Sequence, residues 1–169
     1  HRLYAGHRLA SRFPLPALPA NRTQPTGQLR IRRHAAVVPL DTDFQPGWVH
    51  EWREADGTPV LQLAHSANPS GAHDGCLLRA PTLCDFRIHP HAGTIDVDPH
   101  GDLDAHTLEH LLIDQALPRL LAGRGHLVAH ASQVRIGSES ALFLGRSGWG
   151  KSTLAGLLHQ RGHPALCDD

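Results

Sequence analysis

Over residues 1–100, hydrophobic and polar positions alternate one by one in short runs. Single alternation is the pattern of a strand that buries one face. Glycine- and proline-containing turn sequences separate the runs, and "PHAG" between the last two indicates a hairpin. The runs are 28–33, 48–52, 60–65, 86–89 and 94–98. The pattern therefore predicts a β-rich N-terminal domain.

The pattern changes after residue 101, where leucines recur at helical spacing as far as Leu121. We expect a helix with Asp102 or Asp104 as its N-cap, an end at 123–125, and a bend or break at Pro118. Further on, the apolar runs predict strands and one more helix. The expected elements are strands 126–132, 133–137, 141–145 and 164–167 and a helix over 151–162. The fold class is α/β (α+β), with domains at 1–100 and 101–169.

Composition narrows the functional classes. The formal net charge is +0, which argues against a nucleic-acid partner, and no apolar run approaches the ~20 residues that span a bilayer, which argues against a membrane partner. The 3 cysteines lack metal-ligand spacing, so we expect reduced thiols in a cytoplasmic protein. The chain begins at His1 and has 0 methionines, so we expect a fragment of a longer reading frame.

One motif carries specific chemistry. Residues 145–152, "GRSGWGKS", match the phosphate-binding loop G-x-x-x-x-G-K-[ST], with an apolar strand before and a helix after. The glycines let backbone amides approach phosphate, Lys151 supplies a compact charge, and the Ser152 hydroxyl is a Mg²⁺ ligand. Of 16 Lys+Arg residues, Lys151 is the only lysine. The residues assigned to nucleotide binding are Gly145, Arg146, Ser147, Gly148, Trp149, Gly150, Lys151, Ser152 and Thr153.

A pair of carboxylates follows the loop closely. Asp168 and Asp169 come one helix and one short strand after Lys151, whereas the acidic strand of ABC-type ATPases usually lies far downstream. Adjacent residues on a strand point to opposite sides. One carboxylate is therefore suited to Mg²⁺ and the other to accepting a proton from an attacking hydroxyl.

With these features, residues 130–169 resemble the HPr kinase/phosphorylase superfamily, which is related to the ATP-dependent phosphoenolpyruvate carboxykinases. The resemblance implies an ATP-dependent serine kinase that acts on a protein or peptide, with ATP and Mg²⁺ as cofactors. Asp168 would be the general base, Asp169 would bind Mg²⁺ with Ser152, and His130 would lie near the γ-phosphate together with Lys151. Relatives in the superfamily form oligomers, so the resemblance also allows a homo-oligomer.

The chain departs from that family at two points. Trp149 occupies a loop position that is usually small, and family members continue past the aspartate pair. We therefore expect transfer activity in a longer form of this chain. Two alternatives stay open: a nucleotide-binding regulatory module without transfer activity, and an ABC-like P-loop ATPase.

Three weaker patterns have simpler interpretations. Residues 96–107 resemble a calcium loop but have Thr107 where that loop needs glutamate, so a turn and a helix N-cap fit better. His106 and His110 share a helix face without a third metal ligand and are interpreted as surface residues. Trp48 and Trp52 are expected in the core.

Overall fold

The computed structural model describes residues 2–4, 7–18, 25, 27–33, 49–65 and 75–168. These form two compact units, residues 1–126 and residues 127–169. One large sheet, a small sheet and few helices make this a mixed α/β chain, consistent with the expected α+β class.

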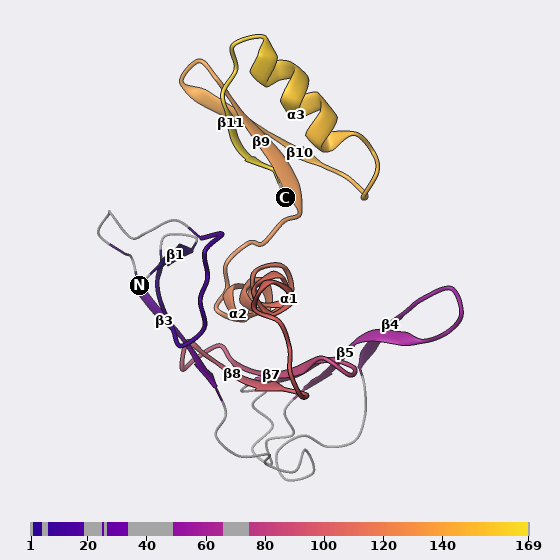
Figure 1. Cartoon of the computed structure of the whole chain (residues 1–169). Helices are drawn as coiled ribbons and strands as arrows, with labels where there is room; N and C mark the ends of the chain where they lie inside the picture. Colours follow the sequence, from indigo (N-terminus) through magenta and orange to yellow (C-terminus); the bar gives the residue numbers. More distant parts are fainter. Residues whose placement is uncertain are drawn as a thin grey trace. The chain divides into compact units, whose positions relative to one another are not determined.

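The first unit is built on an eight-stranded sheet with the order β1-β2-β3-β8-β7-β6-β5-β4 (Figure 1). The pairs β2–β3 and β3–β8 are parallel, and the other neighbouring pairs are antiparallel. The strands are β1 (Arg2–Tyr4), β2 (His7–Ser11), β3 (Gly27–Arg33), β4 (His50–Arg53), β5 (Pro59–His65), β6 (Cys76–Ala80), β7 (Cys84–His89) and β8 (Thr94–Pro99).

Single alternation along these strands separates an apolar face from a polar one. On β7, Phe86 and Ile88 belong to the hydrophobic core, while Asp85 and Arg87 between them are buried polar residues. The expected hairpin is confirmed, since β7 pairs with β8 in antiparallel register with Phe86 opposite Val97. The sheet therefore has one face for the core and one for charged side chains.

A continuous helical run covers the apolar face of the large sheet (Figure 1). It consists of α1 (Ala105–His110), the π-helical turn η1 (Leu111–Ala116) and α2 (Leu117–Gly123). Leu112, Leu117 and Leu120 are fully buried against the core residues of the strands. Pro118 lies in the first turn of α2, and the wider π-helical turn before it takes the place of the expected bend or break.

The packing of the helical run explains where the first unit ends along the chain. Because the helical run buries its leucines against the large sheet, it belongs to the first compact unit, which ends at residue 126. The sequence pattern instead suggested a domain that starts at residue 101. That domain boundary stays a prediction.

The second unit contains three strands and one helix. Its sheet has the order β10-β9-β11, with both outer strands antiparallel to β9. Residues 126–130 are not a strand, so the two strands expected over 126–137 are a single strand that begins later. The elements are β9 (Ala131–Ile136), β10 (Glu139–Leu144), α3 (Lys151–Gln160) and β11 (Ala165–Asp168).

Candidate phosphate-binding site

The loop 145–150 connects the end of β10 to the start of α3 and takes its shape from two glycines. Gly148 and Gly150 have φ of 79° and 82°, in the left-handed region that side chains with a Cβ disfavour. Between them, the Trp149 amide donates a hydrogen bond to the Arg146 carbonyl at 3.2 Å, which closes a turn. Gly150 is the N-cap of α3, and its carbonyl accepts from the Leu154 amide at 2.9 Å. The backbone conformation therefore explains why glycine stands at positions 148 and 150.

Lys151 is the first residue of α3 and is only 8% exposed. Its ammonium Nζ donates to the Arg146 carbonyl oxygen at 3.3 Å, the same oxygen that accepts from the Trp149 amide. Its aliphatic stem passes over Gly145, where a Cβ would lie 4.0 Å from the lysine Cδ. The chain thus holds its one lysine charge against the loop backbone.

Trp149 forms the outer surface of the loop. It is 72% exposed, and its Cε3 would lie 3.4 Å from a Cβ at Gly145. The indole therefore packs edgewise on the first glycine of the motif while most of its ring remains accessible.

The first turn of α3 offers further groups for an anion. Ser152 and Thr153 are exposed, and within the described residues no side chain caps this helix end. No acidic residue lies in the first turn. Unpaired amides and the positive end of the helix dipole therefore face the loop without a competing carboxylate.

The strand register brings three separate segments to one edge of the small sheet. Leu144, the last residue of β10, pairs with Ala131, and Asp168, at the end of β11, pairs with Ser132. Because both outer strands are antiparallel to β9, they run parallel to each other and end at the same edge. With one strand between them, their axes lie about 10 Å apart. The loop, the start of β9 and the end of the aspartate strand, which is β11 with Asp168 as its last residue, therefore share this edge.

The site residues expected from the sequence are distributed as follows. His130 is exposed and immediately precedes β9 at the shared edge. The backbone of Asp168 ends β11 at that edge, while Asp169 lies outside the described residues. The roles of these three residues stay predictions.

The groups at this edge can be compared with the ligands that Mg²⁺ takes in proteins. Mg²⁺ usually binds proteins through one or two carboxylates, keeps several waters and takes its remaining ligands from substrate phosphates. The Ser152 hydroxyl, exposed in the first turn of α3, is one oxygen donor at the same edge as the backbone of Asp168 at the end of β11. Within the described ranges there is no cluster of three or more His, Cys, Asp or Glu residues that could hold a metal ion by itself.

Two features of this edge could not be found from the sequence. Ser132 is fully buried and lies opposite Asp168 in the register of the sheet. The Arg146 carbonyl is the acceptor for the lysine ammonium. A small polar residue at a strand start is a weak sequence signal, and a backbone acceptor gives no signal at all.

The calcium-like segment 96–107 has the simpler explanation. Asp104 caps α1, with its carboxylate accepting from the Thr107 amide at 2.9 Å. Hydrogen bonds from the Thr107 side chain and from the Thr107 amide hold the pKa of Asp104 below its usual value. His110 contacts the carboxylate of Asp114 one turn later. Asp104, His110 and Asp114 therefore make these contacts within the helical run.

Two other expectations concern single residues. Trp52 was expected in the core, but it is 42% exposed and packs against Arg119, whose guanidinium carbon lies 5.4 Å from the ring centroid. Position 52 is on the short edge strand β4, where little of the sheet remains to cover it. Trp48 lies outside the described residues.

The cysteines are free thiols, as expected. Burial raises the pKa of Cys84 to about 12 and that of Cys76 to about 11. Both therefore stay protonated near neutral pH and are poor nucleophiles. Cys167 is exposed.

No family model matches this chain, and neither the curated proteins nor the solved structures contain a significant match to it. Within the described ranges, no helix is long and apolar enough to cross a membrane.

Proposed function

We propose that residues 145–153 of this chain bind Mg²⁺-ATP and that its function is an HPr kinase-like transfer of phosphate to a serine of a protein or peptide. The proposal rests on one observation above the others: the loop, the start of β9 and the end of the aspartate strand share one edge of the small sheet. A nucleotide held by the loop would therefore lie beside groups from all three segments.

The loop supports triphosphate binding through its own groups. The Lys151 ammonium has one hydrogen bond in the described part of the chain, to a carbonyl at 3.3 Å, although it carries three donors. Phosphate oxygens are stronger acceptors because they are charged. The amides of the first turn of α3 add neutral donors on the same side.

Transfer would use the aspartate strand. The serine Oγ attacks the γ-phosphorus, the new O–P bond forms as the bond to the β–γ bridging oxygen breaks, and ADP leaves. Asp168 would accept the serine proton as general base, and His130, which immediately precedes β9 at the same edge, would orient the phosphate. Ser152 and Asp169 would hold Mg²⁺, which would supply positive charge to offset the phosphate charge.

A transfer assay tests the proposal. The full-length protein is incubated with γ-labelled ATP and serine-containing peptides, and label on the peptide is measured alongside ATP binding. We expect Asp168→Asn to lower transfer about 100-fold or more, as for loss of a general base, while ATP binding is retained. Lys151→Ala should lower both.

The matched control is Glu139→Gln, at the opposite edge of the same sheet, paired with Ile136. It should leave transfer and binding unchanged. Equal transfer by Asp168→Asn and the parent protein would refute the assignment of the base. ATP binding without transfer to any serine peptide would instead identify a regulatory nucleotide-binding module.

A further inference from the structure

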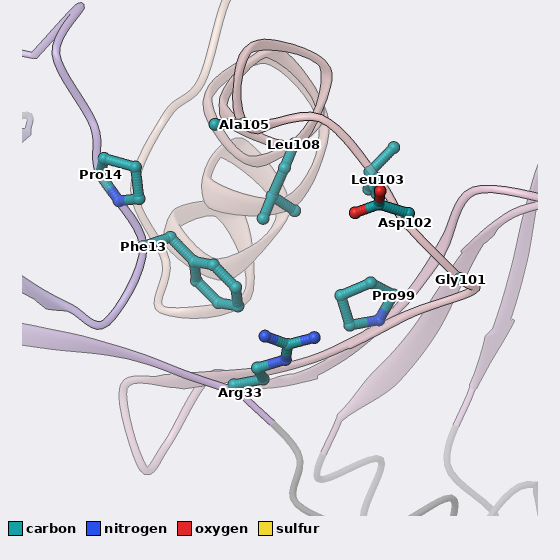
Figure 2. Close-up of a pocket in the computed structure, with 9 residues that line it drawn as sticks. All are labelled: Phe13, Pro14, Arg33, Pro99, Gly101, Asp102, Leu103, Ala105 and Leu108. Carbon is teal, nitrogen blue, oxygen red and sulfur yellow. The ribbon is translucent and has the colours of Figure 1, made fainter.

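The first unit contains a cavity lined by its own residues. It has a volume of about 160 Å³ and lies between the segment after β2, the ends of β3 and β8, and the start of α1 (Figure 2). A dry cavity of about 150 Å³ lined by apolar side chains holds a benzene-sized molecule. This cavity therefore has room for one leucine- or phenylalanine-sized group.

Strand alternation explains why a charged group is found here. On β3, core-facing Leu29 and Ile31 are followed on the same face by Arg33, the last residue of the strand. On β8, the core-facing row that includes Val97 ends at Pro99 in the same way. The cavity thus begins where the apolar rows of the sheet stop, with an arginine in place of the next core residue.

The apolar walls are part of the folded core. Leu108 is 4% exposed and belongs to the core cluster, and Phe13 and Leu103 pack against that cluster. Their positions are set by core packing, so the cavity is largely formed before any ligand arrives.

Two opposite charges face this cavity. In Figure 2 the Arg33 guanidinium extends into the cavity from one wall, and the Asp102 carboxylate faces it from another. Among the described residues, neither takes part in an ion pair. By contrast, Arg32 and Arg79 each bind an aspartate through two hydrogen bonds. A ligand that bears both signs would complete the pair.

We propose that this cavity binds a free α-amino acid with an apolar side chain. The carboxylate pairs with Arg33, the ammonium pairs with Asp102, and the side chain lies against Phe13, Leu103 and Leu108. A peptide end carries only one of the two charges on its terminal residue, so the free amino acid is the form that satisfies both walls. This proposal is independent of nucleotide binding in the second unit.

Calorimetric titration of the full chain with L-leucine tests the proposal. L-leucinamide lacks the carboxylate and N-acetyl-L-leucine lacks the ammonium, so each should bind more weakly than leucine. Because Arg33 and Asp102 are exposed, each ion pair should contribute about fivefold in affinity. Glycine, which has no side chain to fill the cavity, should bind more weakly still.

Variants separate the two charges. Arg33→Gln should weaken leucine about fivefold and leave leucinamide unchanged, and Asp102→Asn should weaken leucine by a similar factor and leave N-acetyl-leucine unchanged. Arg30→Gln, on the opposite face of the same strand, is the control and should change nothing.

Three results would overturn the proposal. The first is no saturable binding of leucine at millimolar concentration. The second is equal binding of leucine and both blocked forms, which would mean that the charges are not used. The third is an Arg33→Gln variant that behaves like Arg30→Gln. Besides these three, preference for the blocked N-acetyl form would replace the free amino acid with a peptide carboxyl terminus as the ligand and so would also overturn the proposal.

Discussion

Lys151 lies in an environment that suits it to a charged ligand. It is 8% exposed, yet its ammonium has a single hydrogen bond, to the Arg146 carbonyl, in the part of the chain that the structure describes. A largely buried ammonium with few acceptors gains more from an added anion than an exposed one does. An arginine at this position would present a planar fork in place of a compact charge.

The two types of glycine near the loop should respond oppositely to alanine. Gly150 has φ of 82°, so Gly150→Ala should raise the energy of the folded loop by about 1–2 kcal/mol and speed amide hydrogen exchange at the start of α3. Gly156 is inside α3 with nothing within 4 Å of a new Cβ, so Gly156→Ala should stabilise the helix by about 0.5–1 kcal/mol. Slower exchange in both variants would contradict the loop conformation.

Thiol labelling distinguishes the three cysteines. Cys76 and Cys84, with pKa raised by burial to about 11 and about 12, should resist alkylation at pH 8, while exposed Cys167 reacts. We expect one equivalent of label on the folded chain and three after unfolding. A Cys167→Ser variant should take up almost no label when folded. Rapid labelling of Cys84 in the native chain would contradict its burial.

At the scale of elements, cross-strand ion pairs tie the polar face of the large sheet together. Arg79 on β6 binds Asp85 on β7 through two hydrogen bonds of 2.8 and 2.9 Å, and the Asp85 side chain is 3% exposed. Arg32 on β3 binds Asp96 on β8 in the same manner, but the arginine side chain is 55% exposed. The two ion pairs thus have a similar geometry, but the Arg79–Asp85 pair is more deeply buried than the Arg32–Asp96 pair.

These two pairs should differ in energy. Arg79→Met leaves the Asp85 carboxylate buried, with His100 at 3.5 Å as its one other ion-pair partner among the described residues, and should lower the free energy of unfolding by about 3 kcal/mol. Arg32→Met should lower it by about 1 kcal/mol or less because water can reach the pair. Urea denaturation of both variants measures the difference. Equal losses would show that burial of Asp85 does not set the strength of its ion pair.

Local pattern predicted some elements well. The β7–β8 hairpin, the helix after the loop and the short strand before Asp168 were all expected, because each depends on alternation or turn residues close in sequence. The parallel pairing of β2 with β3 and of β3 with β8 was not, because partner choice depends on contacts distant in sequence. The π-helical turn before Pro118 likewise depends on how the leucines pack on the sheet.

The candidate site shows the same limit. The motif 145–152 predicted where the loop and its glycines lie, because a phosphate-binding loop requires particular residue types at a particular spacing. The shared sheet edge follows from strand register, and the pairing of Asp168 with Ser132 could not be read from either residue. The cavity beside Arg33 could not be predicted because its walls come from three separate stretches of the sequence.

At the scale of the whole molecule, the two units differ in how many hydrophobic side chains they bury. The main hydrophobic cluster lies entirely within residues 1–126. The second unit buries few side chains, and Leu142, Leu144 and Leu157 are about half exposed or more. Units of such a size seldom fold alone without further burial.

Separate expression of the two units should show this difference. A fragment of residues 1–126 should fold and unfold cooperatively in a thermal melt, while residues 127–169 should give weak, non-cooperative signals. An ordered second fragment beside an unfolded first one would contradict the assignment of the core.

The most direct test of the central claim is a calorimetric titration of the chain with Mg²⁺-ATP, with inorganic triphosphate as a competitor. We predict saturable binding that Lys151→Ala weakens by about tenfold or more, as for loss of a hydrogen bond to a charged group. Arg135→Gln, an exposed cation on β9 away from the loop edge, should leave the affinity unchanged. Equal affinity of the parent chain and Lys151→Ala for Mg²⁺-ATP would contradict the assignment of residues 145–152 as a phosphate-binding loop.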